Sequence, residues 1–212
     1  MDSNHKLTYY LISVCGGSAS GKSTLLEFIR KSFETEVTII SQDDYYYGID
    51  KQIKDKKGVY NFDLPEAIDH ATFLADLLRL SKGETVNRLE YTFNHPYKIP
   101  KQKTFKPAPI VVVEGLFINF TEELNKMINL KVFVDSDIQL CYERRRSRDV
   151  NERGIPEKTF NHQWKKHVLP AHKLYIKPCR KMANFIIDNN NNMIEGFAHL
   201  KAFMQSILKP EV

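Results

Sequence analysis

The sequence predicts an α/β fold in which a parallel β-sheet is flanked by helices on both faces. Two observations favour this fold class. Short apolar segments typical of buried strands alternate along the chain with segments of helical periodicity. A glycine-rich motif at residues 16–23 lies directly between the first such strand and the first helix. Ligands of such sheets bind at the carboxyl ends of the strands, so functional residues are expected at that edge.

The expected strands are the most apolar parts of the chain, and they cover residues 8–15, 37–41, 110–113, 131–134 and 185–188. Helical patterns fill residues 22–33, 65–82, an arginine-rich stretch ending near 152, a long stretch after Pro156 that Pro170 is expected to interrupt, and 193–208. Residues 43–62 are polar, aromatic and charged, which predicts a loop, and residues 86–105 predict a small hairpin.

Length and composition indicate one folded domain. The chain has 212 residues, of which 42% are hydrophobic, and this is enough to form a substantial core. We expect a single domain over residues 1–212, with an insert at about 84–108 and an arginine-rich lid at about 144–156. The formal net charge of +5 suits either a nucleic-acid binder or an enzyme that handles polyphosphates. Because arginines gather at residues 144–153, the second class is favoured and nucleic acid is not an expected partner.

Cysteine usage and hydropathy predict a cytoplasmic protein. Cys15, Cys141 and Cys179 are widely spaced, which indicates free thiols rather than a disulfide framework or a metal site. The N-terminal segment shows no signal-peptide pattern, and no apolar run approaches the roughly 20 residues of a membrane span. A membrane partner is therefore not expected.

The glycine-rich motif carries the strongest chemical signal. Its residues are Gly16, Gly17, Ser18, Ala19, Ser20, Gly21, Lys22 and Ser23, which match the P-loop pattern G-x-x-x-x-G-K-[ST]. Glycines let backbone N–H groups surround phosphate oxygens, and the helix that follows adds its positive N-terminal end. Lys22 is expected to reach the β- and γ-phosphates of a nucleotide, and Ser23 to ligate Mg²⁺. The motif predicts a sheet of the P-loop NTPase type.

Carboxylates follow two of the expected strands. Asp43 and Asp44 come after residues 37–41, where one of them could ligate Mg²⁺ through water or accept a proton from a hydroxyl. In isolation such a pair is more often a helix cap or a solvated turn. Glu114 ends the run of residues 110–113 and has the position of a Walker-B acid, which holds the metal through water.

The second half of the chain contains a group of arginines and a regularly spaced series of histidines. Arg145, Arg148 and Arg153 are candidates for a cationic lid because guanidinium groups bind phosphate oxygens in pairs of hydrogen bonds, although a solvated helix face is the common alternative. His162, His167 and His172 recur every five residues, a spacing that spreads side chains around an α-helix. No metal site is predicted there.

Together these segments resemble the uridine kinase (uridine–cytidine kinase) family along nearly the whole chain. The segments that carry the resemblance are GGSASGKST (16–24), SQDDYY (41–46), YNFDLPEAID (60–69), VVVEG (111–115), FVDSD (133–137), RSRDVNERG (146–154) and IKPCRKMANFIID (176–188). The resemblance implies a P-loop kinase that uses ATP or GTP with Mg²⁺ and phosphorylates the 5′-hydroxyl of uridine or cytidine. It also implies a homo-oligomer, a tetramer in this family.

The resemblance also assigns roles to individual residues. It implies that the segment ending at Thr24 binds the nucleotide, that Lys22 binds phosphate, and that Ser23, Asp43 and Glu114 lie at the metal, with Asp43 as catalytic base. The acceptor side is implied to comprise Asp63 at the ribose hydroxyls, Tyr91 against the base, Arg145 beside the ribose and Gln163 near the nucleoside, with Arg148 and Arg153 as lid arginines.

Two positions differ from the family pattern. Where the family has a histidine that binds the pyrimidine edge, this chain has Pro96, with His95 one place earlier. Where the family tends to have an arginine two residues after Arg153, this chain has Ile155. Proline offers no N–H donor, so weaker use of uridine is expected unless His95 takes part in a refitted pocket.

Other functions remain open at this point. A related kinase for another ribosyl substrate, such as nicotinamide riboside or ribulose phosphate, fits the same motifs. A nucleotide-dependent switch protein is disfavoured because the sequence has no Asn-Lys-x-Asp motif for guanine.

Overall fold

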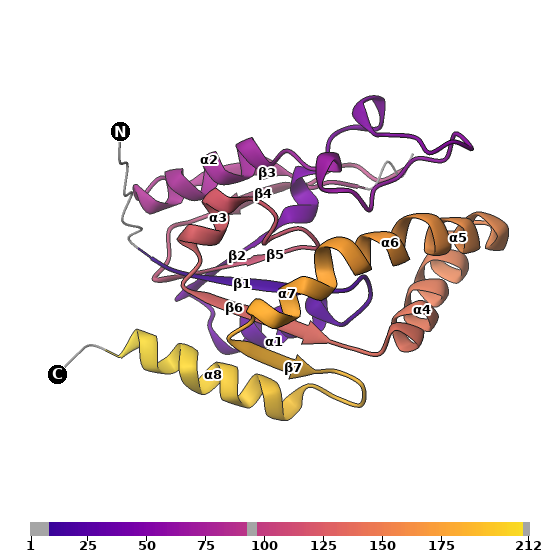
Figure 1. Cartoon of the computed structure of the whole chain (residues 1–212). Helices are drawn as coiled ribbons and strands as arrows, with labels where there is room; N and C mark the ends of the chain where they lie inside the picture. Colours follow the sequence, from indigo (N-terminus) through magenta and orange to yellow (C-terminus); the bar gives the residue numbers. More distant parts are fainter. Residues whose placement is uncertain (1–8, 93–96, 210–212) are drawn as a thin grey trace.

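A computed structural model describes residues 9–92 and 97–209 of the chain (Figure 1). A five-stranded sheet forms its centre, in the order β2-β5-β1-β6-β7, and every pairing is parallel. The strands are β1 (Tyr10–Gly16), β2 (Val37–Ser41), β5 (Ile110–Glu114), β6 (Leu130–Asp135) and β7 (Phe185–Asp188). The predicted parallel sheet is confirmed, and each expected strand lies within two residues of its observed bounds.

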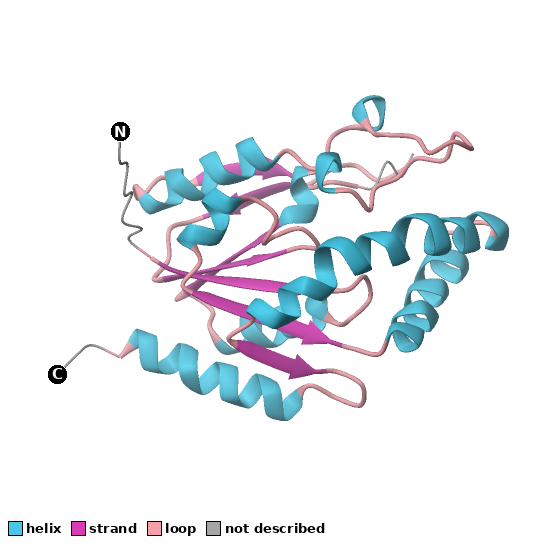
Figure 2. Ribbon diagram, in the orientation of Figure 1, coloured by secondary structure: helices cyan, strands magenta, loops and turns pink. Residues whose placement is uncertain are grey.

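Both faces of the sheet are covered by helices, as the apolar strands predict (Figure 2). Successive residues of β1 point to opposite faces: Leu11 packs in the core on one side, and Ile12 in the core on the other. The helices that contribute buried residues to the Leu11 side are α2 (His70–Ser81), α3 (Glu122–Met127), α6 (Leu169–Ala171) and α7 (Lys177–Met182). Those on the Ile12 side are α1 (Lys22–Ser32) and α8 (Ile194–Leu208).

The insert forms the expected hairpin. Strands β3 (Val86–Leu89) and β4 (Gln102–Phe105) pair antiparallel in a separate two-stranded sheet. The segment between β2 and α2 is irregular, as predicted, and contains short 3₁₀ turns at Gln42–Tyr45, Ile49–Lys51 and Pro65–Ala67.

The arginine-rich stretch and the helix after it form a projecting pair. Helix α4 (Ile138–Arg146) continues as a wide π-helical turn over Ser147–Glu152, and α5 (Glu157–Gln163) runs back beside it (Figure 1). A small apolar cluster of Cys141, Phe160, Trp164 and Val168 holds the pair together.

The expected interruption at Pro170 is wrong, because the helix continues through it. Two further π-helical turns, Trp164–Val168 and His172–Ile176, lie on either side of α6. Proline cannot donate a backbone hydrogen bond, and in an α-helix its ring crowds the carbonyl four residues earlier. The backbone N–H of Leu169 donates to Trp164 O, five residues back, and this wider turn accommodates the ring.

Cys15, Cys141 and Cys179 are free and buried, as expected. Among residues 9–92 and 97–209, no helix has both the length and the apolar character needed to cross a membrane.

Candidate functional site

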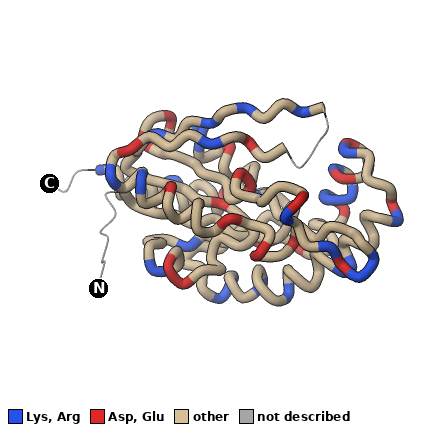
Figure 3. Tube along the Cα trace, turned by 90° about the horizontal axis from the view of Figure 1, so that it is seen from above, with Lys and Arg blue, Asp and Glu red and all other residues tan. Residues whose placement is uncertain are grey.

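A cavity of about 1070 Å³ opens at the carboxyl edge of the sheet. Its walls come from the P-loop, the ends of β2 and β5, the hairpin region, and the α4–α5 pair. The lining residues are Ser18, Ala19, Gly21, Lys22, Ser23, Thr24, Asp43, Tyr46, Phe62, Asp63, Thr92, Lys98, Glu114, Leu116, Arg144, Arg145, Arg148, Asp149, Arg153, Ile155, Gln163 and Asn189. Basic residues are numerous at the end of the molecule where α4 and α5 lie (Figure 3). The volume suits a ligand as large as a nucleotide.

The P-loop connects β1 to α1 in a strained backbone path. Ala19 and Gly21 both have positive φ, at 61° and 103°. A Cβ atom at Gly21 would lie 2.1 Å from the side-chain nitrogen of Asn189, so only glycine fits. Asn189 Nδ2 donates to Ser20 O at 2.8 Å, and Ser136 Oγ donates to the same carbonyl at 3.0 Å. The loop is therefore fixed from the ends of β6 and β7.

Lys22 lies over the loop that it belongs to. Its Nζ donates to the carbonyl oxygens of Gly16 and Gly17, each at 3.1 Å. The ammonium group is thereby held at the mouth of the loop, where a polyphosphate chain would run. A phosphate oxygen would compete with these neutral carbonyls and win on charge.

Three side chains from β2 and β5 meet beside the P-loop. The register pairs Ser41 with Glu114, and Ser41 Oγ donates to Glu114 Oε1 at 2.5 Å. The same Ser41 Oγ accepts the backbone N–H of Asp43 at 3.1 Å, which caps the short turn that follows β2. One serine thus binds the Glu114 carboxylate and the backbone of Asp43, and both acidic residues line the cavity.

This arrangement perturbs Asp43. Burial and the negative charge of Glu114 raise the pKa of Asp43 to about 7, although Lys22 opposes the shift. The carboxylates of Asp43 and Glu114 lie close together, and the charge of Lys22 offsets their repulsion only in part. A bound cation would therefore be stabilised between them. Together with the Ser23 hydroxyl they offer the oxygen ligands that Mg²⁺ prefers, so the donor set fits that ion.

The neighbouring aspartate has a different environment. Both carboxylate oxygens of Asp44 lie 2.8 Å from Lys103 Nζ on β4, and Asp44 Oδ1 also accepts the Tyr91 backbone N–H at 3.3 Å. Asp44 is buried and attaches the hairpin to the end of β2. The residue pattern alone left the choice between the two aspartates open, and the family resemblance assigned Asp43. In the structure Asp43 lines the cavity, whereas Asp44 is not among its lining residues.

The three candidate arginines gather around a carboxylate that the sequence analysis did not single out. Asp149 accepts hydrogen bonds from Arg145 Nε at 3.0 Å, Arg148 Nε at 2.8 Å and Arg153 Nη1 at 3.2 Å. Arg145 also binds Asp63 through Nη1 and Nη2, at 3.1 and 3.4 Å. Although burial disfavours its charge, these arginines lower the pKa of Asp149.

A sequence signal for Asp149 existed. It lies four residues after Arg145 and four before Arg153, which are spacings that bring side chains together on a helix. Arg144 and Asn189 were also missed as site residues. Both line the cavity, and Arg144 Nη2 donates to Asn189 O at 3.1 Å.

Aromatic rings form another wall. Tyr46 and Phe62 line the cavity, and the ring of Tyr91 stacks on Tyr46 with centroids 5.5 Å apart. Tyr91 is not among the lining residues, so it supports this wall from behind. Gln163 and Ile155 also line the cavity. His95 and Pro96 lie outside the described residues.

The sequence is similar to a known protein family and to several of its members. The sequence model of the phosphoribulokinase/uridine kinase family matches residues 11–193. The uridine kinase of Brevibacillus brevis is 33% identical over 178 residues, covering 84% of this chain and 83% of that protein. The uridine kinase of Macrococcus caseolyticus is 30% identical over 200 residues, covering 94% and 97%. Uridine-cytidine kinase A of Dictyostelium discoideum is 32% identical over 185 residues, or 87% of this chain.

The chain is shorter than one of these relatives, and its fold is shared with more distant proteins. The chain spans only 37% of the length of the Dictyostelium protein. Phosphoribulokinase from Rhodobacter sphaeroides superposes with a TM-score of 0.63 at 16% identity, covering 85% of this chain and 70% of that one. D-glycerate 3-kinase from Cryptococcus neoformans gives 0.58 at 12% identity, covering 88% and 89%. At these identities the likeness shows the shared fold alone.

The raised pKa of Asp43 predicts a pH-dependent cost in stability. The unfolded carboxyl loses its proton near pH 4, whereas the folded one keeps it up to about pH 7. The charged form is thus disfavoured in the folded protein, and stability falls as pH rises between these values. We expect Asp43→Asn to raise the melting temperature of the ligand-free protein by ~2–4 °C or more at pH 8, and progressively less toward pH 4.

The matched control is Asp44→Asn, which loses its ion pair with Lys103 and is expected to melt lower than wild type at pH 8. Melting curves of the three proteins between pH 4 and pH 9 test this. Identical curves for Asp43→Asn and wild type at every pH would contradict the assigned environment of Asp43.

The arginine cluster predicts a second difference in stability. Replacing Asp149 with alanine leaves three guanidinium groups without their shared carboxylate, and we expect a loss of about 2–3 kcal/mol in the free energy of unfolding. This is below the 3–5 kcal/mol typical of a fully buried pair, because the side chains of Arg148 and Arg153 are 36% and 39% exposed.

Glu157→Ala is the control on the same helix pair, because it removes an exposed ion pair with Arg146 and should cost much less free energy of unfolding than Asp149→Ala. Urea unfolding measures both values. Equal losses for the two variants would show that Asp149 does not organise the cluster.

Proposed function

This chain belongs to the phosphoribulokinase/uridine kinase family, and we propose that it is a nucleoside kinase. It transfers the γ-phosphate of ATP or GTP to the 5′-hydroxyl of uridine or cytidine. The observation that carries the proposal is the shared cavity, in which a P-loop lysine and an Asp43 carboxyl of raised pKa face a second group of polar residues around Asp63. One wall suits a phosphate donor and the other suits an acceptor with hydroxyl groups.

The donor side follows from the P-loop. Residues 16–24 would wrap the phosphates with backbone N–H groups, and α1, which begins at Lys22 directly after the loop, would add its positive N-terminal end. Lys22 moves from the carbonyls of Gly16 and Gly17 to the transferring phosphate, where its charge stabilises the transition state. Mg²⁺, when bound, neutralises phosphate charge, and Ser23, Glu114 and Asp43 are the residues that would hold it, directly or through water.

Asp43 is proposed as the general base. Its carboxyl lies in the cavity beside Glu114, on a turn that Ser41 fixes from β2. A base with a pKa near the working pH accepts a proton with little penalty in either direction. Phosphoryl transfer needs positioning more than covalent chemistry, so the capped turn matters as much as the basicity.

The acceptor side is organised by charge and by rings. Asp63 is proposed to accept hydrogen bonds from the ribose hydroxyls, and Arg145 orients its carboxylate through two hydrogen bonds. Tyr46 and Phe62, with Tyr91 stacked behind Tyr46, offer an aromatic surface for a flat base. Gln163 supplies an amide that can donate to or accept from the base edge. Arg148 and Arg153 cover the transferring phosphate.

The cavity wall at Ile155 differs from the family pattern. Ile155 lines the cavity where the family tends to have arginine, so one wall offers shape without charge. Another ribosyl substrate, such as nicotinamide riboside, is the alternative, because SQDDYY (41–46) and the run of arginines after Cys141 suit such a kinase as well. A cytoplasmic location, one domain over residues 1–212 and assembly as a homo-tetramer remain predictions from the sequence and its resemblance.

A substrate panel tests the proposal. The purified chain is incubated with Mg²⁺ and ATP or GTP, and with uridine, cytidine, adenosine or nicotinamide riboside in turn, while the monophosphate product is measured by chromatography. We expect uridine or cytidine to give the highest kcat/KM. Product from nicotinamide riboside alone would overturn the assigned acceptor, and no product from any nucleoside would overturn the nucleoside kinase.

The same assay includes Lys22→Ala, which is expected to lower kcat by at least about 10²-fold because its charge acts on the transition state. Lys31→Ala is the matched control, since that lysine is exposed on the same helix in a pair with Glu27. Similar losses in both variants would contradict the role given to Lys22.

Asp43→Asn is expected to lower kcat by roughly 10²–10⁴-fold with little change in the KM for nucleoside. Asparagine keeps the size of the side chain but cannot take the proton. Asp44→Asn should act mainly on melting temperature, because Asp44 binds the hairpin. If Asp44→Asn loses kcat and Asp43→Asn does not, the base has been assigned to the wrong neighbour.

A further inference from the structure

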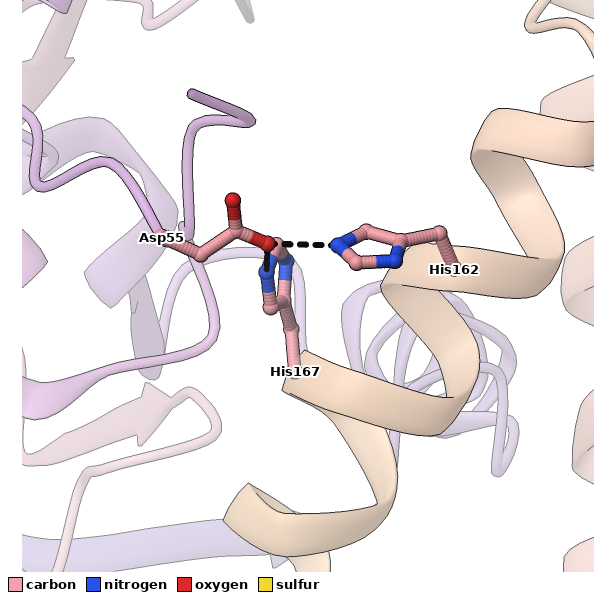
Figure 4. Close-up of side chains that lie close together, drawn as sticks. All are labelled: Asp55, His162 and His167. Carbon is pink, nitrogen blue, oxygen red and sulfur yellow. Dashed lines mark hydrogen bonds and ion pairs between the residues drawn. The ribbon is translucent and has the colours of Figure 1, made fainter. Parts of the chain in front are cut away.

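A cluster of metal-ligating side chains lies away from the P-loop, between the loop after β2 and the helix that contains α5. Its members are Asp55, His162 and His167, and one carboxylate oxygen and one nitrogen from each imidazole lie within 4.8 Å of one another. Figure 4 shows both imidazoles directed at the same oxygen of Asp55. His162 Nε2 lies 2.5 Å and His167 Nε2 lies 2.9 Å from Asp55 Oδ2.

The two histidines meet because of the local helix geometry, which corrects the expectation from the sequence. A five-residue spacing separates side chains on an α-helix, but Trp164–Val168 is a π-helical turn with more residues per turn. Residues five apart then project on the same side. Their rings are packed edge to face with centroids 5.6 Å apart. The backbone therefore holds both Nε2 atoms near one point.

The carboxylate is also held in place before any ligand arrives. Asp55 Oδ1 accepts the backbone N–H groups of Lys57 at 2.8 Å and Val59 at 3.0 Å, which leaves Oδ2 directed at the imidazoles. The side chain of His167 is only 2% exposed, and those of His162 and Asp55 are 16% and 18% exposed. The cluster is sheltered but can be reached from solvent.

We propose that Asp55, His162 and His167 form a binding site for a divalent transition metal ion of the Zn²⁺ class, with solvent completing the coordination. Two imidazole nitrogens and one carboxylate oxygen are a ligand set typical of Zn²⁺ and its neighbours, whereas Mg²⁺ and Ca²⁺ take oxygen ligands. Bonds of about 2.0–2.2 Å in a tetrahedron separate ligand atoms by roughly 3.3 Å. Each side chain would therefore move by about an ångström or less from its present hydrogen-bonded place.

The position of the site indicates what bound metal does. Asp55 belongs to the loop that leads to Phe62 and Asp63, and His162 adjoins Gln163; all three of these neighbours line the cavity. An ion bound here connects the loop to the lid helix across the acceptor side of the cavity. The site is then a clip that fixes two walls relative to each other, and it is separate from the phosphate-binding residues.

Metal titration tests the site directly. The full chain is treated with chelator, dialysed into Mg²⁺ without nucleotide, and titrated with Co²⁺ while its visible spectrum is recorded; Zn²⁺ is then added in competition. We expect about one Co²⁺ per chain with nitrogen and oxygen ligation, displaced by Zn²⁺. We also expect His162→Gln and His167→Gln each to weaken binding by at least about 100-fold, more than is usual for residues outside the coordination shell.

Two further variants act as controls. His199→Gln removes an exposed histidine on α8 and should bind Co²⁺ as wild type does. Asp55→Asn keeps an amide oxygen for the N–H groups of Lys57 and Val59 but removes the anionic ligand, so it should fold and bind metal weakly. Melting curves confirm that each variant is folded. Absence of a bound ion in wild type, binding through thiolates, or equal binding in all variants would show that the three residues form a hydrogen-bonded cluster only.

Hydrogen exchange tests the connection between the walls. Zn²⁺ should slow exchange of backbone amides in residues 49–59 of wild type at least several-fold, and should not do so in His167→Gln. Unchanged exchange in wild type with metal bound would overturn the role as a clip. Neither the metal titration nor the hydrogen-exchange measurement involves nucleotide or turnover. Their outcomes are therefore independent of the proposed kinase activity.

Discussion

The parallel pairing of β5 with both β1 and β2 is the constraint on which the site depends. Its register places Glu114 beside Val14 of β1 and Ser41 of β2, so the P-loop and both carboxylates emerge at one edge of the sheet. Every residue of β5 is buried, with alternate side chains packed in the cores on the two faces of the sheet, and a slip of one residue would exchange these faces and disrupt the packing on both sides. The hydrophobic core therefore fixes the chemistry at the edge.

The negative charges of Asp43 and Glu114 lie at this edge of the sheet, and Lys22 offsets them only in part. Burial and Glu114 disfavour the charge of Asp43, and Lys22 is held on carbonyl oxygens rather than on a carboxylate. The unfavourable charge of Asp43 lowers the free energy of unfolding of the ligand-free protein. A bound metal ion, together with phosphates, would offset this loss. Such local conflict between stability and charge is characteristic of functional sites.

The sequence predicted what depends on local pattern and missed what depends on the path of the backbone. Apolar runs gave the strands, and the glycine-rich motif gave the loop and Lys22. Pattern alone could not separate Asp43 from Asp44, because the choice depends on Lys103, which lies 59 residues away on β4. The pairing of His162 with His167 was missed because it requires a π-helical turn, which propensities do not predict.

Asp149 holds three arginine side chains of α4 and the turn after it in place before any ligand binds. Arginines that cover a phosphate must be positioned before it binds, since ordering long side chains on binding costs free energy. The buried carboxylate of Asp149 binds Arg148 and Arg153, the two arginines proposed for this role, together with Arg145, and so supplies this order. Each guanidinium carries five N–H groups, so Arg148, which uses Nε for Asp149, can bind phosphate oxygens without releasing that contact. The same carboxylate, through Arg145, also sets the position of Asp63. In the proposed kinase, Asp149 would thereby link the phosphate side of the cavity to its acceptor side.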